Sequence, residues 1–233
     1  MASILVIAHP GGGTSGVLEQ AAQLAGAALE EWRPAETTQP SAAIDDYDGL
    51  VVLGGGQNVA EQQRYPYLTG EIAQIAAWHA GGRPLLGVCL GAQLLAAATG
   101  GTVTRLPVPQ VGWWNLERLP AGASDPLLGF GDARIRSYQW HSWAVGPPAG
   151  ASVLARDAAC VQAFRLGNSW GVQFHPEVTG AVVAEWIDDW RSDGDVVAAG
   201  FDPAEQRAQA ERELPAWNAY GVELFGRFCA LLG

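Results

Sequence analysis

The sequence from Pro84 to Gly91 reads PLLGVCLG, an apolar segment that leads directly into Cys89. It predicts a short buried strand over 84–88, followed at once by a helix. A sharp strand-to-helix turn is the setting of a nucleophile elbow, which lifts one side chain above the edge of a sheet. Gly87 and Gly91 suit such a turn because positions beside its tip lie close to neighbouring backbone. We therefore expect Cys89 at the carboxyl end of a buried strand.

Strand and helix signals alternate through the first half of the chain, the pattern of a parallel sheet covered by helices. The expected strands there are 3–8, 27–33, 50–53 and 84–88, and the expected helices are 16–25 and 69–80. Short β segments follow at 102–105, 112–119, 133–138, 152–155, 160–166 and 169–174. We predict an α/β fold: an open, mostly parallel sheet with helices on both faces and a small β-rich extension.

The last part of the chain carries helical spacing of apolar residues. Helices are expected over 179–190, 204–213 and 217–232, and 192–200 is expected to be a surface connection. We find no internal repeat and no low-complexity linker. The prediction is one domain over residues 1–233 with a C-terminal helical tail from about residue 193.

Composition narrows the possible partners. With 13 basic and 24 acidic residues the net charge is −11, which repels nucleic acid and anionic lipid surfaces. The uncharged stretch 84–104 contains Pro84 and several glycines, so it is expected to be a buried strand and helix and not a membrane span. The three cysteines, Cys89, Cys160 and Cys229, lack the spacing of a disulfide framework or a metal site. We expect a cytoplasmic protein that binds neither membrane nor nucleic acid and uses no metal.

A second motif, GVQFHPE at 171–177, ends a predicted strand in His175 and Glu177. Positions i and i+2 of an extended chain point to the same side, and Pro176 favours an extended His175. Glu177 can therefore orient the imidazole while its other nitrogen faces the thiol. Taken alone, a buried cysteine is usually an apolar filler and a His-Pro-Glu stretch a solvated turn. Together they predict a triad of Cys89, His175 and Glu177.

These motifs resemble those of class I glutamine amidotransferases. Residues 87–93 resemble the nucleophile motif of that family, 172–177 resemble its His-x-Glu motif, and 53–56 resemble its oxyanion loop. The similarity runs over roughly residues 4–179 and is closest to stand-alone proteins related to the amidotransferase domain of GMP synthase. It implies a flavodoxin-like sheet with Cys89 at its carboxyl edge.

The resemblance also implies roles for further residues. The backbone N–H groups of Gly55 and Leu90 would form the oxyanion hole, with Gly54 as the alternative to Gly55. The substrate pocket would include Gly54, Gln93, Gly112 and Trp113. The alternatives are that Gln93 is a polar helix residue and Trp113 a core residue. Gly56 stands where the family often has proline, and residues 140–143 (WHSW) replace a common His-Gly-Asp stretch. These departures concern substrate specificity more than the chemistry. His141 is expected to be structural, with contact to the pocket as the alternative.

The implied activity is hydrolysis of the γ-carboxamide of glutamine through a γ-glutamyl thioester, without a cofactor. Residues 11–16 (GGGTSG) lack the Gly-Lys-Ser/Thr ending of a phosphate-binding loop, and no synthetase-type nucleotide loop follows. Any ammonia acceptor is therefore expected on a separate synthetase subunit. Three alternatives remain: a hydrolase of other γ-glutamyl amides or peptides, a non-catalytic binding protein, and a redox protein with an elbow cysteine.

Overall fold

The computed structural model describes residues 1–232, in which nine strands form one sheet in the order β2-β1-β3-β4-β9-β8-β6-β5-β7. The parallel part comprises β1 (Ser3–Ile7), β2 (Ala28–Trp32), β3 (Gly49–Val52), β4 (Leu85–Val88) and β9 (Ser169–Val172). The antiparallel part comprises β5 (Thr102–Arg118), β6 (Arg134–Gly146), β7 (Ser152–Arg156) and β8 (Val161–Leu166). The predicted α/β fold is confirmed, and the β-rich extension contributes four of these strands.

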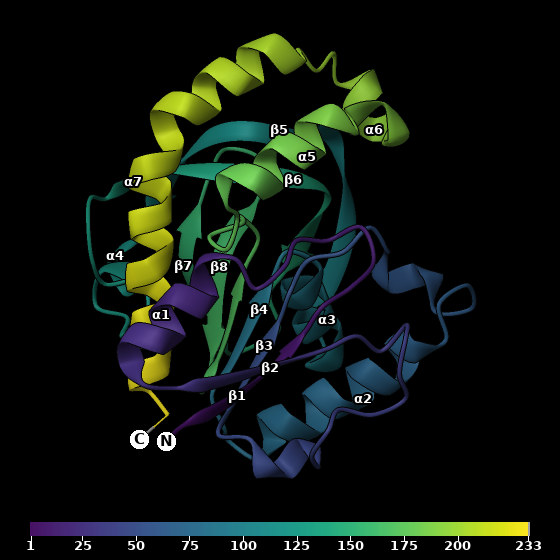
Figure 1. Cartoon of the computed structure of the whole chain (residues 1–233), viewed down its shortest axis with the longest axis vertical. Coiled ribbons are helices and arrows are strands. Elements are labelled where there is room, and N and C mark those ends of the chain that lie inside the picture. The colour runs from purple at the N-terminus through teal and green to yellow at the C-terminus, as the bar shows by residue number, and fades with distance from the viewer. Residues whose placement is uncertain (233) are drawn as a thin grey trace.

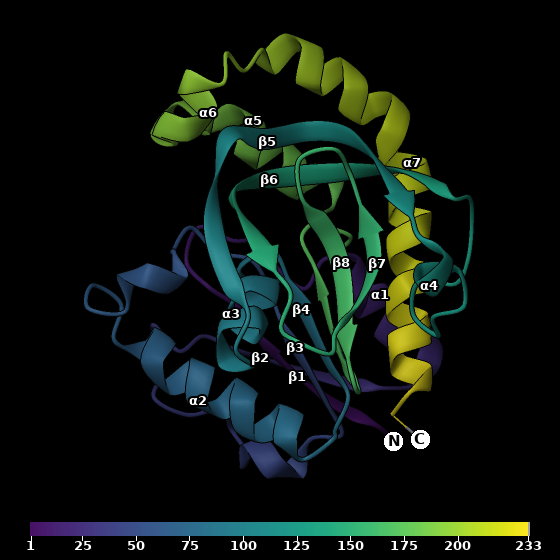
Figure 2. The same ribbon diagram turned by 180° about the vertical axis from the view of Figure 1, so that it is seen from behind.

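Helices cover both faces of the sheet. They are α1 (Val17–Ala25), α2 (Tyr67–Ala80), α3 (Leu90–Ala98), α4 (Pro120–Ala123), α5 (Gly180–Asp188), α6 (Gly194–Ala198) and α7 (Pro203–Ala230). Ile4 and Val6 of β1 pack with α1, α5 and α7, whereas Leu5 and Ile7 pack with α2 and α3. Alternate residues of a strand point to opposite faces, so this division shows two cores, one on each face. Figure 1 shows α1 and α7 side by side on one face, and Figure 2 shows α2 and α3 from behind.

Two strands are longer than predicted. The segments 102–105 and 112–119 form one strand, β5, whose pairing with β6 shifts between Arg105 and Gln110. Two prolines lie inside that shift, and proline cannot donate to a strand ladder, which explains why the sequence reads as two pieces. The prediction that the next strand ends at residue 138 is also wrong, because β6 continues to Gly146 along β5.

The C-terminal helices also differ from the prediction. The expected surface connection 192–200 contains α6, and the two expected helices are one, α7, which continues through Pro215. An internal proline costs a helix about 3 kcal/mol. Burial of Trp217, Leu224 and Phe225 on the C-terminal half of α7 offsets that cost. Within residues 1–232, no helix combines the length and apolar character needed to cross a bilayer.

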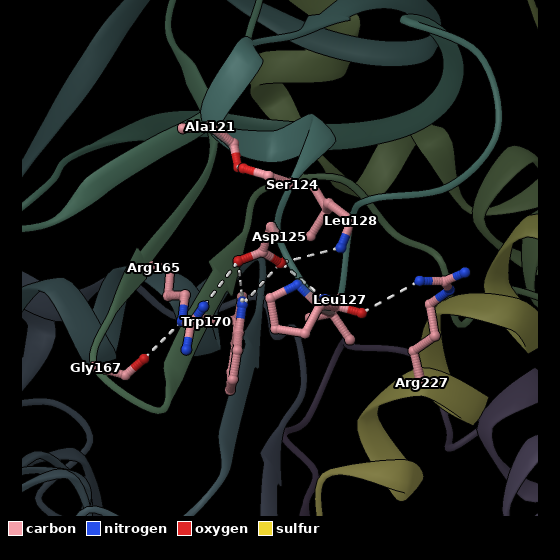
Figure 3. Close-up of polar contacts among 10 residues, drawn as sticks. Ala121, Ser124, Asp125, Leu127, Leu128, Arg165, Gly167, Trp170 and Arg227 are labelled. Atoms are coloured by element: carbon pink, nitrogen blue, oxygen red, sulfur yellow. Dashed lines mark hydrogen bonds and ion pairs between the residues drawn. The ribbon is translucent and has the colours of Figure 1, made fainter.

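A buried carboxylate fixes the loop between β5 and β6 to the sheet (Figure 3). Asp125 is 5% exposed and accepts hydrogen bonds from the backbone N–H groups of Leu127 and Leu128, at 2.8 and 3.0 Å. The Trp170 indole N–H lies 3.1 Å from the same Oδ1, and Arg165 lies 3.5 Å from Oδ2 and over the Trp170 ring. One carboxylate thus satisfies donors from the loop and from strands β8 and β9.

Replacement of Asp125 by alanine should lower the free energy of unfolding by about 2–4 kcal/mol, because several buried donors would lose their acceptor. Urea denaturation of the variant would measure the loss. Asp132→Ala is the matched control, since Asp132 is exposed on the same loop. Equal stability of both variants would show that the Asp125 contacts contribute little.

Candidate active site

Cys89 lies at the junction between β4 and α3, with φ 52° and ψ −107°. Among the described residues it is the only non-glycine residue with positive φ, a conformation that costs energy and is found mainly where function requires it. Its N–H donates to the Val172 carbonyl at 2.8 Å, and its carbonyl accepts from the Gln93 N–H at 3.1 Å. These bonds hold the turn between the neighbouring strand β9 and the first turn of α3.

The glycines on either side of Cys89 are required by close packing. A Cβ on Gly87 would lie 2.5 Å from the Gly91 carbonyl carbon and oxygen, and a Cβ on Gly91 would lie 2.0 Å from the Val52 carbonyl oxygen. Any side chain at either position would force α3 away from the sheet. The spacing of glycine around Cys89 therefore reflects how tightly the helix starts above β3 and β4.

His175 and Glu177 follow β9 and are both buried. Nδ1 of His175 lies 2.7 Å from Oε1 of Glu177. The His175 backbone is held on both sides, because its N–H donates to the Tyr138 carbonyl at 2.9 Å and its carbonyl accepts from the Trp217 indole N–H at 2.8 Å. The edge-to-face contact with Trp186, at 4.9 Å between ring centroids, further limits rotation of the imidazole.

The His175 ring and Cys89 approach each other beside Gly54. A Cβ on Gly54 would lie 3.0 Å from Cε1 of His175 and 3.4 Å from Cβ of Cys89. Nε2 of His175 has no hydrogen-bond partner among residues 1–232, and the Cys89 sulfur lies 3.9 Å from the Trp140 carbonyl. The structure thus brings the three predicted triad residues to one place.

The charge state of His175 depends on its neighbours. Burial opposes the imidazolium, but the Glu177 carboxylate and the Cys89 thiol outweigh it and raise the pKa of His175 to about 10. His141, which lies in the same region, shows the opposite behaviour. Burial, together with the positive charge of His175, lowers the pKa of His141 to about 4, although the hydrogen bond to the Trp143 carbonyl opposes this.

We expect His175 to be doubly protonated at pH 8 and His141 to be neutral there. Nitrogen chemical shifts of the imidazole rings, measured by NMR between pH 5 and 10, would test this, with His141 as the internal control. Because the folded-state pKa of His175 is raised, its contribution to stability is complete below the unfolded value of about 6.5. That contribution should be lost as the pH rises towards 10. A neutral His175 ring at pH 8 would contradict the prediction.

Within residues 1–232, several backbone N–H groups beside Cys89 donate no hydrogen bond. Leu90 is the first residue of α3, so its N–H has no acceptor within the helix. In the loop after β3, Leu53 donates to the Ile7 carbonyl and Gly56 to the Pro10 carbonyl, whereas Gly54 and Gly55 donate no backbone hydrogen bond among the described residues. Gly55 and Leu90 both line the cavity that contains Cys89. These groups can therefore donate to an oxygen bound beside the sulfur.

The cavity has a volume of about 870 Å³. Cys89, His175, Gly55, Leu90 and Gln93 all line it. Gln93 is buried, and its Nε2 donates to the Trp143 carbonyl at 3.2 Å. The structure describes no cluster of three or more His, Cys, Asp or Glu side chains suited to a metal ion within residues 1–232.

Of the four predicted substrate-binding residues, only Gln93 lines this cavity. Trp113 is buried in the core, edge-on to Tyr138 and Trp217 at centroid distances of 5.2 and 6.4 Å. Gly112 lies against α7, where a Cβ would be 2.2 Å from Oε1 of Gln206. Val111 lines the cavity instead. Gly54 contacts the His175 ring and Cys89 from behind, but it is not among the cavity-lining residues.

Several cavity residues were not predicted from the sequence. Trp140, Trp143 and Trp186 line it, as does His141. Trp140 and Trp143 lie on the part of β6 that the sequence did not predict as a strand, and Trp186 comes from α5. Two sequence signals pointed to this pocket: the ten tryptophans, and the 140–143 stretch (WHSW) that departs from the family pattern.

Two curated relatives match the chain over only part of their own lengths. The chain is 38% identical over 146 residues to a glutamine-hydrolysing GMP synthase of Aeropyrum pernix, which is 61% of this chain and 27% of that protein. It is 33% identical over 144 residues to a γ-glutamyl-L-1-hydroxyisopropylamide hydrolase of a Pseudomonas species, which is 58% of this chain and 48% of that protein. The chain thus spans about a quarter to a half of the length of these two relatives.

A solved structure and a family model each match most of the chain. A glutamine amidotransferase structure from Thermotoga maritima superposes with a TM-score of 0.87 and 26% sequence identity, covering 98% of both chains. The family model described as Glutamine amidotransferase class-I matches residues 14–189, the range that contains Cys89, His175 and Glu177. The chain belongs to the class I glutamine amidotransferase family.

Proposed function

We propose that this protein hydrolyses the γ-carboxamide of glutamine, or of a close γ-glutamyl relative, with Cys89 as nucleophile. The observation that carries the proposal is the convergence of three features on one cavity. These are the elbow thiol, the imidazole held 2.7 Å from Glu177, and the two free N–H groups of Gly55 and Leu90. This combination is what acyl transfer requires: a nucleophile, an oriented acid–base group and donors for an oxyanion.

In the first half-reaction the Cys89 thiolate attacks the carboxamide carbon of the substrate. The N–H groups of Gly55 and Leu90 donate to the oxygen that becomes negatively charged. The His175 imidazolium then gives its Nε2 proton to the departing nitrogen, so that ammonia leaves and a γ-glutamyl thioester remains. Glu177 keeps the ring oriented and supports its positive charge before the proton is given up.

In the second half-reaction water attacks the thioester. Neutral His175 takes a proton from this water as the new carbon–oxygen bond forms, and the same two N–H groups hold the oxyanion. The carbon–sulfur bond then breaks, which releases glutamate and restores the Cys89 thiolate beside the protonated imidazole. No electron transfer occurs, and each proton has a named donor and acceptor.

The size of the cavity favours a second candidate substrate class. Pockets for drug-sized ligands have volumes of about 300–1,000 Å³, so a cavity of about 870 Å³ leaves room beyond free glutamine. The indole rings of Trp140, Trp143 and Trp186 lie along this space and can contact an apolar amine substituent. One relative is named as a hydrolase of a γ-glutamyl amide, which supports N-substituted γ-glutamyl amides as the alternative.

The test is a substrate panel with the isolated chain. Glutamine, γ-glutamyl alkylamides and γ-glutamyl dipeptides would be supplied in parallel, and released glutamate would be measured. Acid-quenched samples would be analysed by mass spectrometry for a γ-glutamyl adduct on Cys89. Turnover of glutamine favours a glutaminase, whereas selective turnover of a substituted amide favours the second class. Absence of turnover and of any adduct with every substrate would refute the proposal.

A partner remains part of the proposal. A separate synthetase subunit that accepts ammonia is the proposed partner. In that case the isolated chain should hydrolyse glutamine slowly, and the subunit should raise the rate. Acceleration of glutamine hydrolysis on addition of such a subunit would be the supporting result.

A further inference from the structure

A buried histidine–glutamate pair lies directly behind the loop that carries Gly54 and Gly55. His9 follows β1, Glu71 lies on α2, and the two side chains are 0% and 1% exposed. Nε2 of His9 is 3.0 Å from both carboxylate oxygens of Glu71, and its Nδ1 is 3.3 Å from the Gly54 carbonyl oxygen. The ring therefore connects a helix on one side to the loop on the other.

The polar groups around His9 determine which ring nitrogen donates to the loop. The Gly54 carbonyl can only accept, so its contact with Nδ1 requires a proton on that nitrogen, while Nε2 pairs with the Glu71 carboxyl group. Both side chains are buried, so removal of either one would leave the other without its polar partner. The ring therefore directs one donor, Nδ1–H, at the loop.

That donor controls the orientation of one peptide group. The Gly54 carbonyl and the Gly55 N–H belong to the same peptide unit, which is trans, so the two groups point in opposite directions. While His9 holds the carbonyl on its own side, the Gly55 N–H must point to the other side. Gly55 lines the cavity there, together with Cys89 and Leu90.

The loop needs such a restraint because glycine permits many backbone conformations. Backbone hydrogen bonds hold Leu53 and Gly56, on either side of this peptide, but among residues 1–232 His9 is the hydrogen-bond donor found for the Gly54 carbonyl. Close packing also limits the site: a Cβ on Gly12 would lie 2.2 Å from the Gly54 oxygen, and a Cβ on Gly55 would lie 2.6 Å from Cβ of His9. A rotated peptide would place a carbonyl where an oxyanion must bind.

We propose that His9 and Glu71 are positioning residues that hold the Gly54–Gly55 peptide with its N–H facing Cys89. This inference rests on the proposed function, since the oriented N–H serves an oxyanion. His9 itself touches no reacting atom and acts only through the peptide.

The experiment compares His9→Ala with His9→Asn, whose amide N–H can take the place of Nδ1–H. Loss of one oxyanion donor costs about 100-fold or more in kcat, so His9→Ala should lower kcat by about that factor with little change in KM. His9→Asn should recover most of the rate. Glu71→Gln, which keeps an acceptor for Nε2, should lose less than Glu71→Leu, and thermal unfolding would confirm that each variant is folded.

Alkylation of Cys89 by iodoacetamide separates positioning from general damage, because that reaction forms no oxyanion. Its rate in His9→Ala should stay within about threefold of the parent rate. Equal losses in alkylation and hydrolysis would overturn the proposal, as would unchanged kcat in His9→Ala. A crystal structure of His9→Ala gives a readout without substrate: a rotated Gly54–Gly55 peptide supports the proposal and an unmoved one overturns it. A parent protein without any γ-glutamyl hydrolysis would refute the proposed function alone.

Discussion

Cys89→Ser and Cys89→Ala should each lower the release of glutamate from the preferred γ-glutamyl substrate by about 10⁴-fold or more, because removal of a nucleophile eliminates the covalent route. The hydroxyl of serine is smaller than the thiol, and the neighbouring imidazolium does not ionise it. The γ-glutamyl adduct should disappear from mass spectra of both variants. Turnover in a coupled glutamate assay and intact mass under single-turnover conditions would measure the two effects.

The chain offers matched controls for this experiment. Cys160 and Cys229 lie outside the cavity, and burial raises the pKa of both thiols, that of Cys160 to about 12. Cys160→Ser and Cys229→Ala should therefore retain most of the hydrolytic activity. Turnover at parental rates in Cys89→Ala would mean that the elbow thiol is not the nucleophile.

The parallel half of the fold could be predicted because its signals are local. Strands β1, β3 and β4 are apolar runs, and each strand from β1 to β4 lies beside a strand that a helix or loop connects to it. The extents of β5 and β6 could not be predicted because they depend on each other. Trp140 and His141 are in a strand only because they pair with Val111 and Gln110. Pro107 and Pro109 conceal this pairing in the sequence.

The same distinction applies to the candidate site. Cys89, His175 and Glu177 were predicted because each lies in a short motif whose geometry depends on adjacent residues. Gly112 and Trp113 were assigned by resemblance alone, and the direction in which each faces depends on the twist of β5 against α7. No local pattern could reveal the pair of His9 and Glu71. Its members are 62 positions apart, and a glutamate on a helix ordinarily faces solvent.

Glu177→Gln should lower kcat by about 100-fold or more at neutral pH while the substrate KM changes little. The amide oxygen of glutamine can still accept from Nδ1 of His175, so the ring keeps its place. The substitution removes the negative charge of Glu177. Burial lowers the pKa of His175, and this charge helps to raise it to about 10. The imidazolium would then be depleted at neutral pH, and less of the protonated form would be available to the leaving nitrogen.

The dependence of kcat on pH should differ between the parent protein and Glu177→Gln. In the parent protein the alkaline loss of kcat should occur near pH 10, where His175 deprotonates. In Glu177→Gln the same loss should move to lower pH, so the variant should recover part of its activity as the pH falls below neutrality. Glu211→Gln removes the same charge from an exposed position on α7 and should leave the profile unchanged. An alkaline limb at the same pH in Glu177→Gln and the parent would show that Glu177 does not set the protonation of His175.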